Sequence, residues 1–133
     1  MKIDLFVYGT LRKGLRLHHH LRGAVYTHDA RTRGRLYDIG TYPGLLIDSS
    51  ADWVTGEVFE VDEQLVSLLD QVEGYKPDSS VHSEYLRREI SVYNFHHKEL
   101  KVTTYIYNRP VMGLSLIGSG DYKKYLDNQS SHF

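Results

Sequence analysis

The chain has 133 residues, a length typical of one compact domain that buries its own hydrophobic core. Its 16 basic and 17 acidic residues give a net charge of −1, so no excess of positive charge indicates nucleic acid or anionic lipid as a partner. The absence of cysteine excludes disulfide scaffolds, thiolate metal sites and cysteine nucleophiles.

The N-terminal segment MKIDLFVYG has only a short apolar run before Gly9. It lacks the apolar core and the small-residue cleavage site of a signal peptide. No stretch of the chain approaches the roughly 20 apolar residues that a membrane helix needs. We therefore expect a cytoplasmic domain without a membrane partner.

The first part of the chain is predicted to consist mainly of strands. Residues 2–8 are apolar enough to form a strand covered on both faces, and residues 15–22 can form a short helix. A second strand is expected over residues 24–40, where Gly34 and Gly40 indicate a bulge or a bend.

Two further signals follow in the sequence. Pro43 and Gly44 form the Pro-Gly pair that type II turns favour at their central positions, and a short strand is expected to follow them. Residues 52–61, DWVTGEVFEV, alternate as a strand does. Gly56 lies inside that strand and predicts a bend or the close approach of another backbone.

The spacing of apolar residues then becomes that of a helix. They fall at positions i, i+3, i+4 and i+7, namely Leu65, Leu68, Leu69 and Val72. Asp62 is a suitable N-cap, and Gly74 stands where a glycine commonly follows a helix end. This helix should therefore end at Glu73.

The rest of the chain is predicted to form a polar loop, a hairpin and a terminal helix. The loop covers residues 76–84, the hairpin strands cover 85–95 and 99–108, and the helix covers 119–128, after an irregular segment. We expect a single α+β domain over residues 1–127, with a largely antiparallel, curled or closed sheet flanked by short helices. Residues 128–133 should form a flexible tail.

Several common functional motifs are absent. His18, His19 and His20 cannot serve one metal from a regular helix, since successive side chains point about 100° apart, and no carboxylate spacing completes a metal site. GTLRKG is not a phosphate loop, because Leu15 stands where that motif requires lysine. There is no G-x-G-x-x-G fingerprint, and GSG at 118–120 is not a serine-hydrolase elbow.

The loop Tyr8-Gly9-Thr10-Leu11 is the first candidate for a binding site. A strand that ends in this loop exposes successive backbone N–H groups, which suit a carboxylate or a developing oxyanion. Gly9 also removes the side chain that would keep a ligand away from the backbone. The structural alternative is an ordinary strand-to-helix turn.

Glu73 is the second candidate. A carboxylate at a helix C-terminus faces the negative end of the helix dipole, and partial burial next to Val72 and Tyr75 would also raise its pKa. Such a glutamate suits general acid–base catalysis. The alternative is an exposed glutamate at the start of a loop.

These segments together resemble the γ-glutamylcyclotransferase family, and more closely its compact AIG2-like branch. The resemblance rests on five blocks in the same order, over roughly residues 3 to 125: YGTLRKG, GEVFEVD…LLDQVEGY, EYLRREISV, TTYIY and LIGSGDY. The family implies a small β-barrel-like fold with short helices. It also implies cyclisation of a γ-glutamyl amine or peptide to 5-oxoproline, with release of the amine and without a cofactor.

The resemblance also implies residue roles. Tyr8, Gly9, Thr10 and Leu11 would bind the γ-glutamyl group, Glu73 would be the catalytic acid and base, and Tyr105 would line the pocket. Arg87, in the Tyr-Leu-Arg block, fits a structural salt bridge better. Members of the branch differ at the acid position, but LDQVEG keeps Glu73 in register with it, and Glu84 is a second carboxylate that could face the same cavity.

Other interpretations remain open at this stage. The same cavity could belong to a non-catalytic module that binds a γ-glutamyl or amino-acid ligand, or to an interaction domain with an accidental cavity. The leaving amine would contact loops such as 40–46 and 76–84, whose composition does not specify a ligand. The loop amides could hold the oxyanion or the α-carboxylate, and the protein could be a monomer or a weak homodimer.

Overall fold

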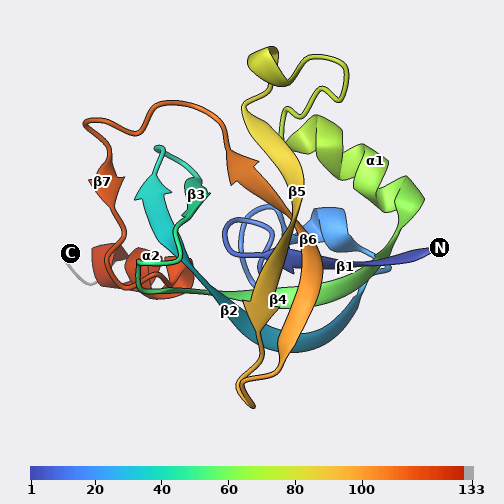
Figure 1. The fold of residues 1–133 in the computed structure, drawn as a ribbon, viewed down its shortest axis with the longest axis horizontal. Coiled ribbons are helices and arrows are strands. Elements are labelled where there is room, and N and C mark those ends of the chain that lie inside the picture. The colour runs from blue at the N-terminus through green and yellow to red at the C-terminus, as the bar shows by residue number, and fades with distance from the viewer. Residues whose placement is uncertain (131–133) are drawn as a thin grey trace.

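The computed structural model describes residues 1–130 (Figure 1). The strands are β1 (Lys2–Val7), β2 (Val25–Asp38), β3 (Pro43–Ile47), β4 (Trp53–Asp62), β5 (Tyr85–Tyr93), β6 (Glu99–Tyr107) and β7 (Ser115–Leu116). The α-helices are α1 (Glu63–Val72) and α2 (Tyr122–Ser130), and short 3₁₀ helices cover η1 (His18–Leu21) and η2 (Ser80–His82). Neither α-helix is long and apolar enough to cross a membrane.

Five of these strands close into a barrel in the order β2-β4-β1-β6-β5. Closure occurs where β2 pairs with β5 at Arg31 and Tyr93. All neighbouring strands are antiparallel except β1 and β6, which run parallel. The prediction of an α+β fold with a largely antiparallel, barrel-like sheet and short helices is confirmed.

The long strand β2 belongs to two parts of the sheet. Up to Arg33 it pairs with β4, and from Gly34 onward it pairs with β3. A Cβ atom at Gly34 would lie 2.5 Å from the carbonyl oxygen of Leu46, so a side chain would not fit at this crossing. The predicted bend thus occurs at Gly34, whereas the bulge lies earlier, between Tyr26 and His28.

Gly56 confirms the predicted close approach of a second backbone. A Cβ atom there would lie 2.4 Å from the carbonyl oxygen of Val7, so β4 can pass β1 only with glycine at this position.

The predicted turn at Pro43 and Gly44 is wrong. β3 begins at Pro43, and the residue with a positive φ is Gly40, at 132°. Gly44 is required for a different reason, because a Cβ atom there would lie 2.7 Å from the Cγ atom of the Tyr107 ring.

Two helix boundaries also differ from the predictions. The helix expected over residues 15–22 is shorter, a 3₁₀ turn over His18–Leu21. The terminal helix α2 continues to Ser130, beyond the residue at which we placed the end of the domain. The remaining part of the predicted tail, residues 131–133, lies outside the described residues.

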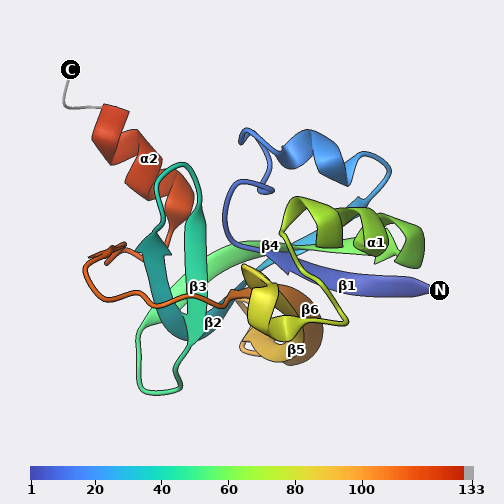
Figure 2. The same ribbon diagram turned by 90° about the horizontal axis from the view of Figure 1, so that it is seen from above.

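The side chains of β1 alternate between two hydrophobic clusters. Leu5 and Val7 pack in the cluster that also contains Leu69 of α1, whereas Phe6 packs in the cluster that contains Tyr122 of α2. The two helices lie far apart, on either side of the barrel strands (Figure 2). The core of the protein is therefore continuous through the second half of β1. The prediction that β1 is buried on both faces is confirmed from Leu5 onward, whereas Lys2 and Asp4 are exposed.

Candidate functional site

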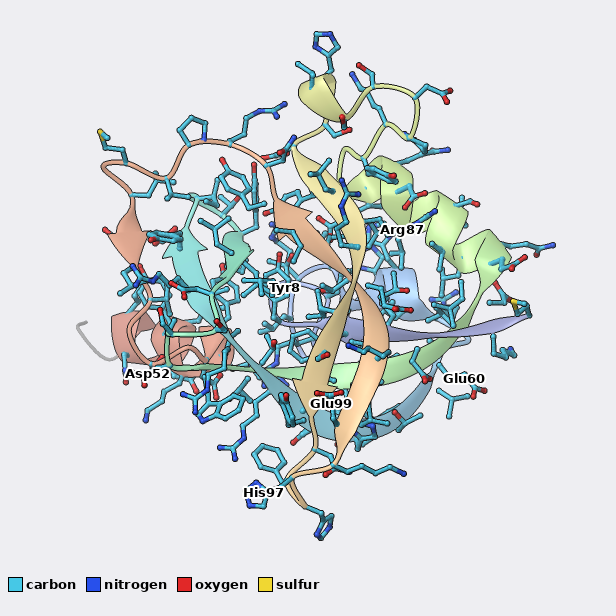
Figure 3. The ribbon with its side chains drawn as sticks, viewed as in Figure 1. Tyr8, Asp52, Glu60, Arg87, His97 and Glu99 are labelled. Atoms are coloured by element: carbon cyan, nitrogen blue, oxygen red, sulfur yellow. The ribbon has the colours of Figure 1, made fainter. Side chains whose placement is uncertain are left out.

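A pocket that is open to solvent lies where β1 ends against the C-terminal end of α1. Its lining comes from β1 and the loop after it, the end of α1, the start of β3, β5 and β6, namely Phe6, Val7, Tyr8, Gly9, Thr10, Leu11, Leu17, Tyr42, Pro43, Val72, Glu73, Glu84, Tyr85, Thr104 and Tyr105. The candidate residues Tyr8, Gly9, Thr10, Leu11, Glu73 and Tyr105 are thus brought together in one cavity. Figure 3 shows Tyr8 near the centre of the molecule.

The carbonyl groups of the loop after β1 are bonded to the chain that follows it. The Arg12 amide donates to the Gly9 oxygen (3.0 Å), the Leu17 amide donates to the Thr10 oxygen (2.9 Å), and His18 Nδ1 lies 2.8 Å from the Leu11 oxygen.

The amide groups of the same loop have no such partners. The N–H groups of Gly9, Thr10 and Leu11 donate no hydrogen bond to any acceptor within residues 1–130. Three successive free donors beside a cavity can bind a negatively charged oxygen. Gly9 is required by packing as well, because a Cβ atom there would lie 2.6 Å from Pro43 Cγ.

A buried ionic network, which sequence reasoning missed, holds this loop in place. Arg12 is 6% exposed and Glu57 is 2% exposed. Glu57 accepts hydrogen bonds from Arg12 Nε (3.0 Å), the Lys13 amide (2.9 Å) and Lys123 Nζ (3.1 Å), and Arg12 also pairs with Asp121 (3.0 Å). Burial alone would raise the pKa of Glu57, but these partners together hold it below its usual value.

Glu73 is positioned by the end of α1. The Asp62 carboxylate caps the start of this helix by accepting from the Leu65 amide at 2.8 Å. At the other end Gly74 has a φ of 65°, its amide donates to Gln71, and the Tyr75 amide donates to Asp70, which is a Schellman motif. The predicted caps, and the helix end at Glu73, are confirmed.

The electrostatic surroundings of Glu73 favour its protonated form. Its side chain is partly buried and accepts no hydrogen bond from the described residues. Burial, followed by the nearby charge of Glu84, raises the pKa of Glu73 to about 7. A carboxyl group with this pKa can both accept and donate a proton near neutral pH.

Three buried tyrosines form the deep wall of the pocket, and each is held by a hydrogen bond. Tyr8 donates to the Tyr105 carbonyl oxygen (2.7 Å), and Tyr85 donates to the Pro43 carbonyl oxygen (2.6 Å). Tyr105 donates to Asp70 Oδ1 of α1 (2.6 Å). Burial raises the pKa of all three phenols, so they are neutral in the physiological range.

Arg87 lies outside the pocket. Its Nη1 atom pairs with Asp70 Oδ2 at 2.6 Å, which confirms the predicted structural salt bridge. Figure 3 shows Arg87 beside α1. Because Asp70 also accepts from Tyr105, this pair ties α1 to the two strands that carry Arg87 and Tyr105.

Glu84 does face the same pocket as Glu73. The Tyr42 hydroxyl donates to Glu84 Oε2, and this hydrogen bond is the main reason that the pKa of Tyr42 is raised to about 12. We had expected loops 40–46 and 76–84 to line the outer part of the pocket, and Tyr42, Pro43 and Glu84 come from them.

Sequence reasoning did not identify Tyr42, Tyr85 or Thr104 as pocket residues. Tyr85 directly precedes the Leu-Arg of the EYLRREISV block, which was the only available signal. Tyr42 was covered only by the expectation for loop 40–46, and Thr104 only by its place in the TTYIY block.

The histidines form no metal-binding group within residues 1–130. His18 instead contacts the Leu11 carbonyl oxygen, and its ring packs on Phe59 with a centroid separation of 5.6 Å.

Comparison with known proteins gives a consistent result. The family model described as γ-glutamyl cyclotransferase, AIG2-like, matches residues 5–124. The γ-L-glutamyl-butirosin B γ-glutamyl cyclotransferase of Niallia circulans is 36% identical over 108 residues, which are 80% of this chain and 67% of that protein.

Solved structures share the fold. The structure of YkqA from Bacillus subtilis has a TM-score of 0.79 and 29% identity, and the match covers 98% of this chain but only 43% of that longer chain. An AIG2-like protein from Mus musculus has a TM-score of 0.71 and 26% identity, covering 86% of this chain and 84% of that one.

Proposed function

Because the chain belongs to the AIG2-like γ-glutamylcyclotransferase family, we propose that it cyclises a γ-glutamyl amine or γ-glutamyl peptide to 5-oxoproline and releases the amine. The observation that carries this proposal is that one pocket is lined both by the loop Gly9–Leu11, whose amides are free, and by Glu73, whose pKa is raised. A small-molecule substrate suits a concave pocket with a largely apolar lining and a few polar groups.

The proposed reaction uses the substrate as its own nucleophile. The α-amine attacks the γ-carbonyl carbon, a five-membered lactam forms, and the bond from that carbon to the leaving nitrogen breaks. Holding the amine and the carbonyl together makes this step intramolecular, which can account for several kcal/mol of the barrier. The chemistry requires no cofactor and no protein nucleophile.

Glu73 supplies the proton transfers. As a carboxylate it accepts a proton from the α-ammonium group, which frees the amine for attack. As a carboxylic acid it returns a proton to the leaving nitrogen, which would otherwise be a poor leaving group. A pKa of about 7 suits both steps, since the group then changes state readily near neutral pH.

The free amides of Gly9, Thr10 and Leu11 bind negatively charged oxygen, either the α-carboxylate or the oxyanion that forms on the γ-carbonyl. The buried wall of Tyr8, Tyr85 and Tyr105 excludes water from the glutamyl group.

A mass-spectrometric assay for 5-oxoproline tests the proposal. The purified protein is incubated with a panel of γ-glutamyl amines and dipeptides, including γ-glutamyl-ε-lysine, with Glu73→Gln as the comparison variant. We expect release by the wild type and a loss of about 10²–10⁴-fold in the variant. No release from any substrate, together with thermal stabilisation by γ-glutamyl ligands, would instead indicate a binding module.

A further inference from the structure

The proposed reaction needs one acid–base group, yet two carboxylates line the pocket. Glu84 stands at the end of the loop before β5, and its side chain is partly exposed. Its one side-chain hydrogen bond within residues 1–130 is the one that Tyr42 donates to Oε2. Among those residues no lysine, arginine or histidine forms an ion pair with Glu84. A second carboxylate is therefore present that the proposed mechanism does not use.

The charge of the pocket is unbalanced. Among residues 1–130, Glu73 and Glu84 are the charged side chains of its lining, and no basic side chain lines it. The charge of Glu84 acts on Glu73 directly, since it contributes to the raised pKa of that group. A positively charged group brought by the substrate would offset this repulsion, because opposite charges across an interface complement each other.

Exposure indicates where such a group would lie. Tyr85 of the deep wall and the nearby lining residue Thr104 are 3% and 0% exposed, whereas Val72 is 38% exposed and both Glu84 and Tyr42 are partly exposed. Glu84 and Tyr42 therefore lie nearer the opening of the pocket than Tyr85 and Thr104 do. With the glutamyl group held at the loop amides and Glu73, the leaving amine extends toward this opening.

We propose that Glu84, oriented by Tyr42, makes the pocket selective for γ-glutamyl amines whose leaving amine carries a second, positively charged group. This inference rests on the proposed function. Glu84 is in this view a specificity-determining residue that contacts the leaving group rather than the reacting atoms. The hydrogen bond from Tyr42 to Oε2 holds the carboxylate in one orientation, which lowers the entropic cost of pairing with an incoming cation.

A matched substrate pair tests the proposal. The γ-glutamyl amides of 1,5-diaminopentane and of n-hexylamine have the same chain length and differ in ending with an ammonium or a methyl group. We expect the wild type to show a kcat/KM at least about tenfold higher for the cationic amide, as one charge-assisted hydrogen bond provides. Glu84→Gln should bring this ratio close to one, and Tyr42→Phe should lower it in part.

The ratio between the two substrates separates this role from other effects. A change in the pKa of Glu73 alters the rates with both amides alike, so it leaves the ratio unchanged. Glu89→Gln is the matched control, because Glu89 is an exposed carboxylate of β5 that does not line the pocket. An equal loss with both amides in Glu84→Gln, or equal use of both by the wild type, would overturn the proposal.

A binding measurement distinguishes this failure from failure of the proposed function. Calorimetric titration of Glu73→Gln with each amide needs no turnover, and we expect tighter binding of the cationic amide that is lost in Glu73→Gln/Glu84→Gln. Selective binding without 5-oxoproline release by the wild type would overturn the proposed function but retain the selectivity. Binding of neither amide would overturn both.

Discussion

At Glu73 the backbone and the pocket act on the carboxyl group in the same direction. The residue caps the C-terminal end of α1, where the helix dipole disfavours negative charge. Burial and the neighbouring Glu84 also raise its pKa, to about 7. The raised pKa of Glu73 should therefore be measurable in two ways, from the pH dependence of activity and from the pH dependence of stability.

The pH dependence of activity should report this pKa. In the proposed mechanism the carboxylate form of Glu73 starts the reaction, so kcat/KM should rise as the pH increases through about 7. Glu84→Gln removes the neighbouring charge and should move this rise to lower pH. Steady-state rates between about pH 3.5 and 9 provide the measurement, and a rise centred near 4.5, the ordinary value for glutamate, would contradict the assignment.

Stability should depend on pH in the opposite sense. Between pH 4.5 and about 7 the folded state keeps a proton on Glu73 that the unfolded state has lost, so the free energy of unfolding falls as the pH rises. Relative to Glu73→Gln, the wild type should lose roughly 1–3 kcal/mol between pH 5 and 8. Urea denaturation of both proteins at pH 5 and pH 8 gives the change in the free energy of unfolding for each, and the difference between the two changes is the quantity predicted.

This stability test has a control variant and an outcome that would contradict it. Glu89→Gln removes an exposed carboxylate and should follow the wild type. Parallel stability curves for the wild type and Glu73→Gln would mean that Glu73 has an ordinary pKa in the folded protein.

Gly9 offers a test of the loop amides. In Gly9→Ala the new methyl group would meet Pro43, so the loop must shift and its amides must move with it. We expect kcat/KM to fall at least about tenfold. A rise in KM alone would assign the amides to the α-carboxylate, whereas a fall in kcat would assign them to the oxyanion. Gly118→Ala is the control, because nothing lies within 4 Å of a Cβ atom there, and it should retain full activity.

At the scale of elements, the buried network around Glu57 joins the loop after β1 to α2. In Arg12→Met the 2%-exposed Glu57 carboxylate loses one of its cations, which should cost roughly 3 kcal/mol of stability. Arg35→Met removes a pair whose side chains are 51% and 33% exposed, and it should cost less than about 1 kcal/mol. Denaturant midpoints measure both, and equal losses would show that burial does not set the value of these pairs.

Elements with strong local signals were predicted correctly from the sequence. The apolar spacing from Leu65 to Val72, with Asp62 before it and Gly74 after it, predicted α1 and its end at Glu73. The turn at Pro43 and Gly44 was wrong because packing against Tyr107, distant in the sequence, decides the conformation there. Local preference is a sound guide only where tertiary contacts agree with it.

Contacts between distant segments had no local signal in the sequence. Barrel closure joins Arg31 to Tyr93, and the Tyr42–Glu84 hydrogen bond joins two loops, and neither depends on a periodicity or a cap. The strand end at Tyr8–Leu11 and the helix end at Glu73 were candidates from local reasoning, whereas Tyr105 and the roles of all these residues came from the family resemblance. The structure adds how the chain brings them together.

At the scale of the whole molecule, both hydrophobic clusters meet at β1, and the network at Glu57 links the N-terminal loop to the C-terminal helix. The protein should therefore unfold as one unit, with equal calorimetric and van't Hoff enthalpies. For this length the heat capacity change should be about 1.6–2.0 kcal/mol/K. Differential scanning calorimetry tests this, and two resolved transitions would contradict the single domain that we predict.

The central claim is that Glu73 promotes an intramolecular cyclisation, and the most direct test is turnover in H₂¹⁸O. Cyclisation uses the α-amine of the substrate, so mass spectrometry should find unlabelled 5-oxoproline and released amine, both strongly reduced in Glu73→Gln. Attack by water would instead give glutamate carrying one ¹⁸O atom. Labelled glutamate, or unlabelled 5-oxoproline formed equally well without the Glu73 carboxylate, would contradict the mechanism.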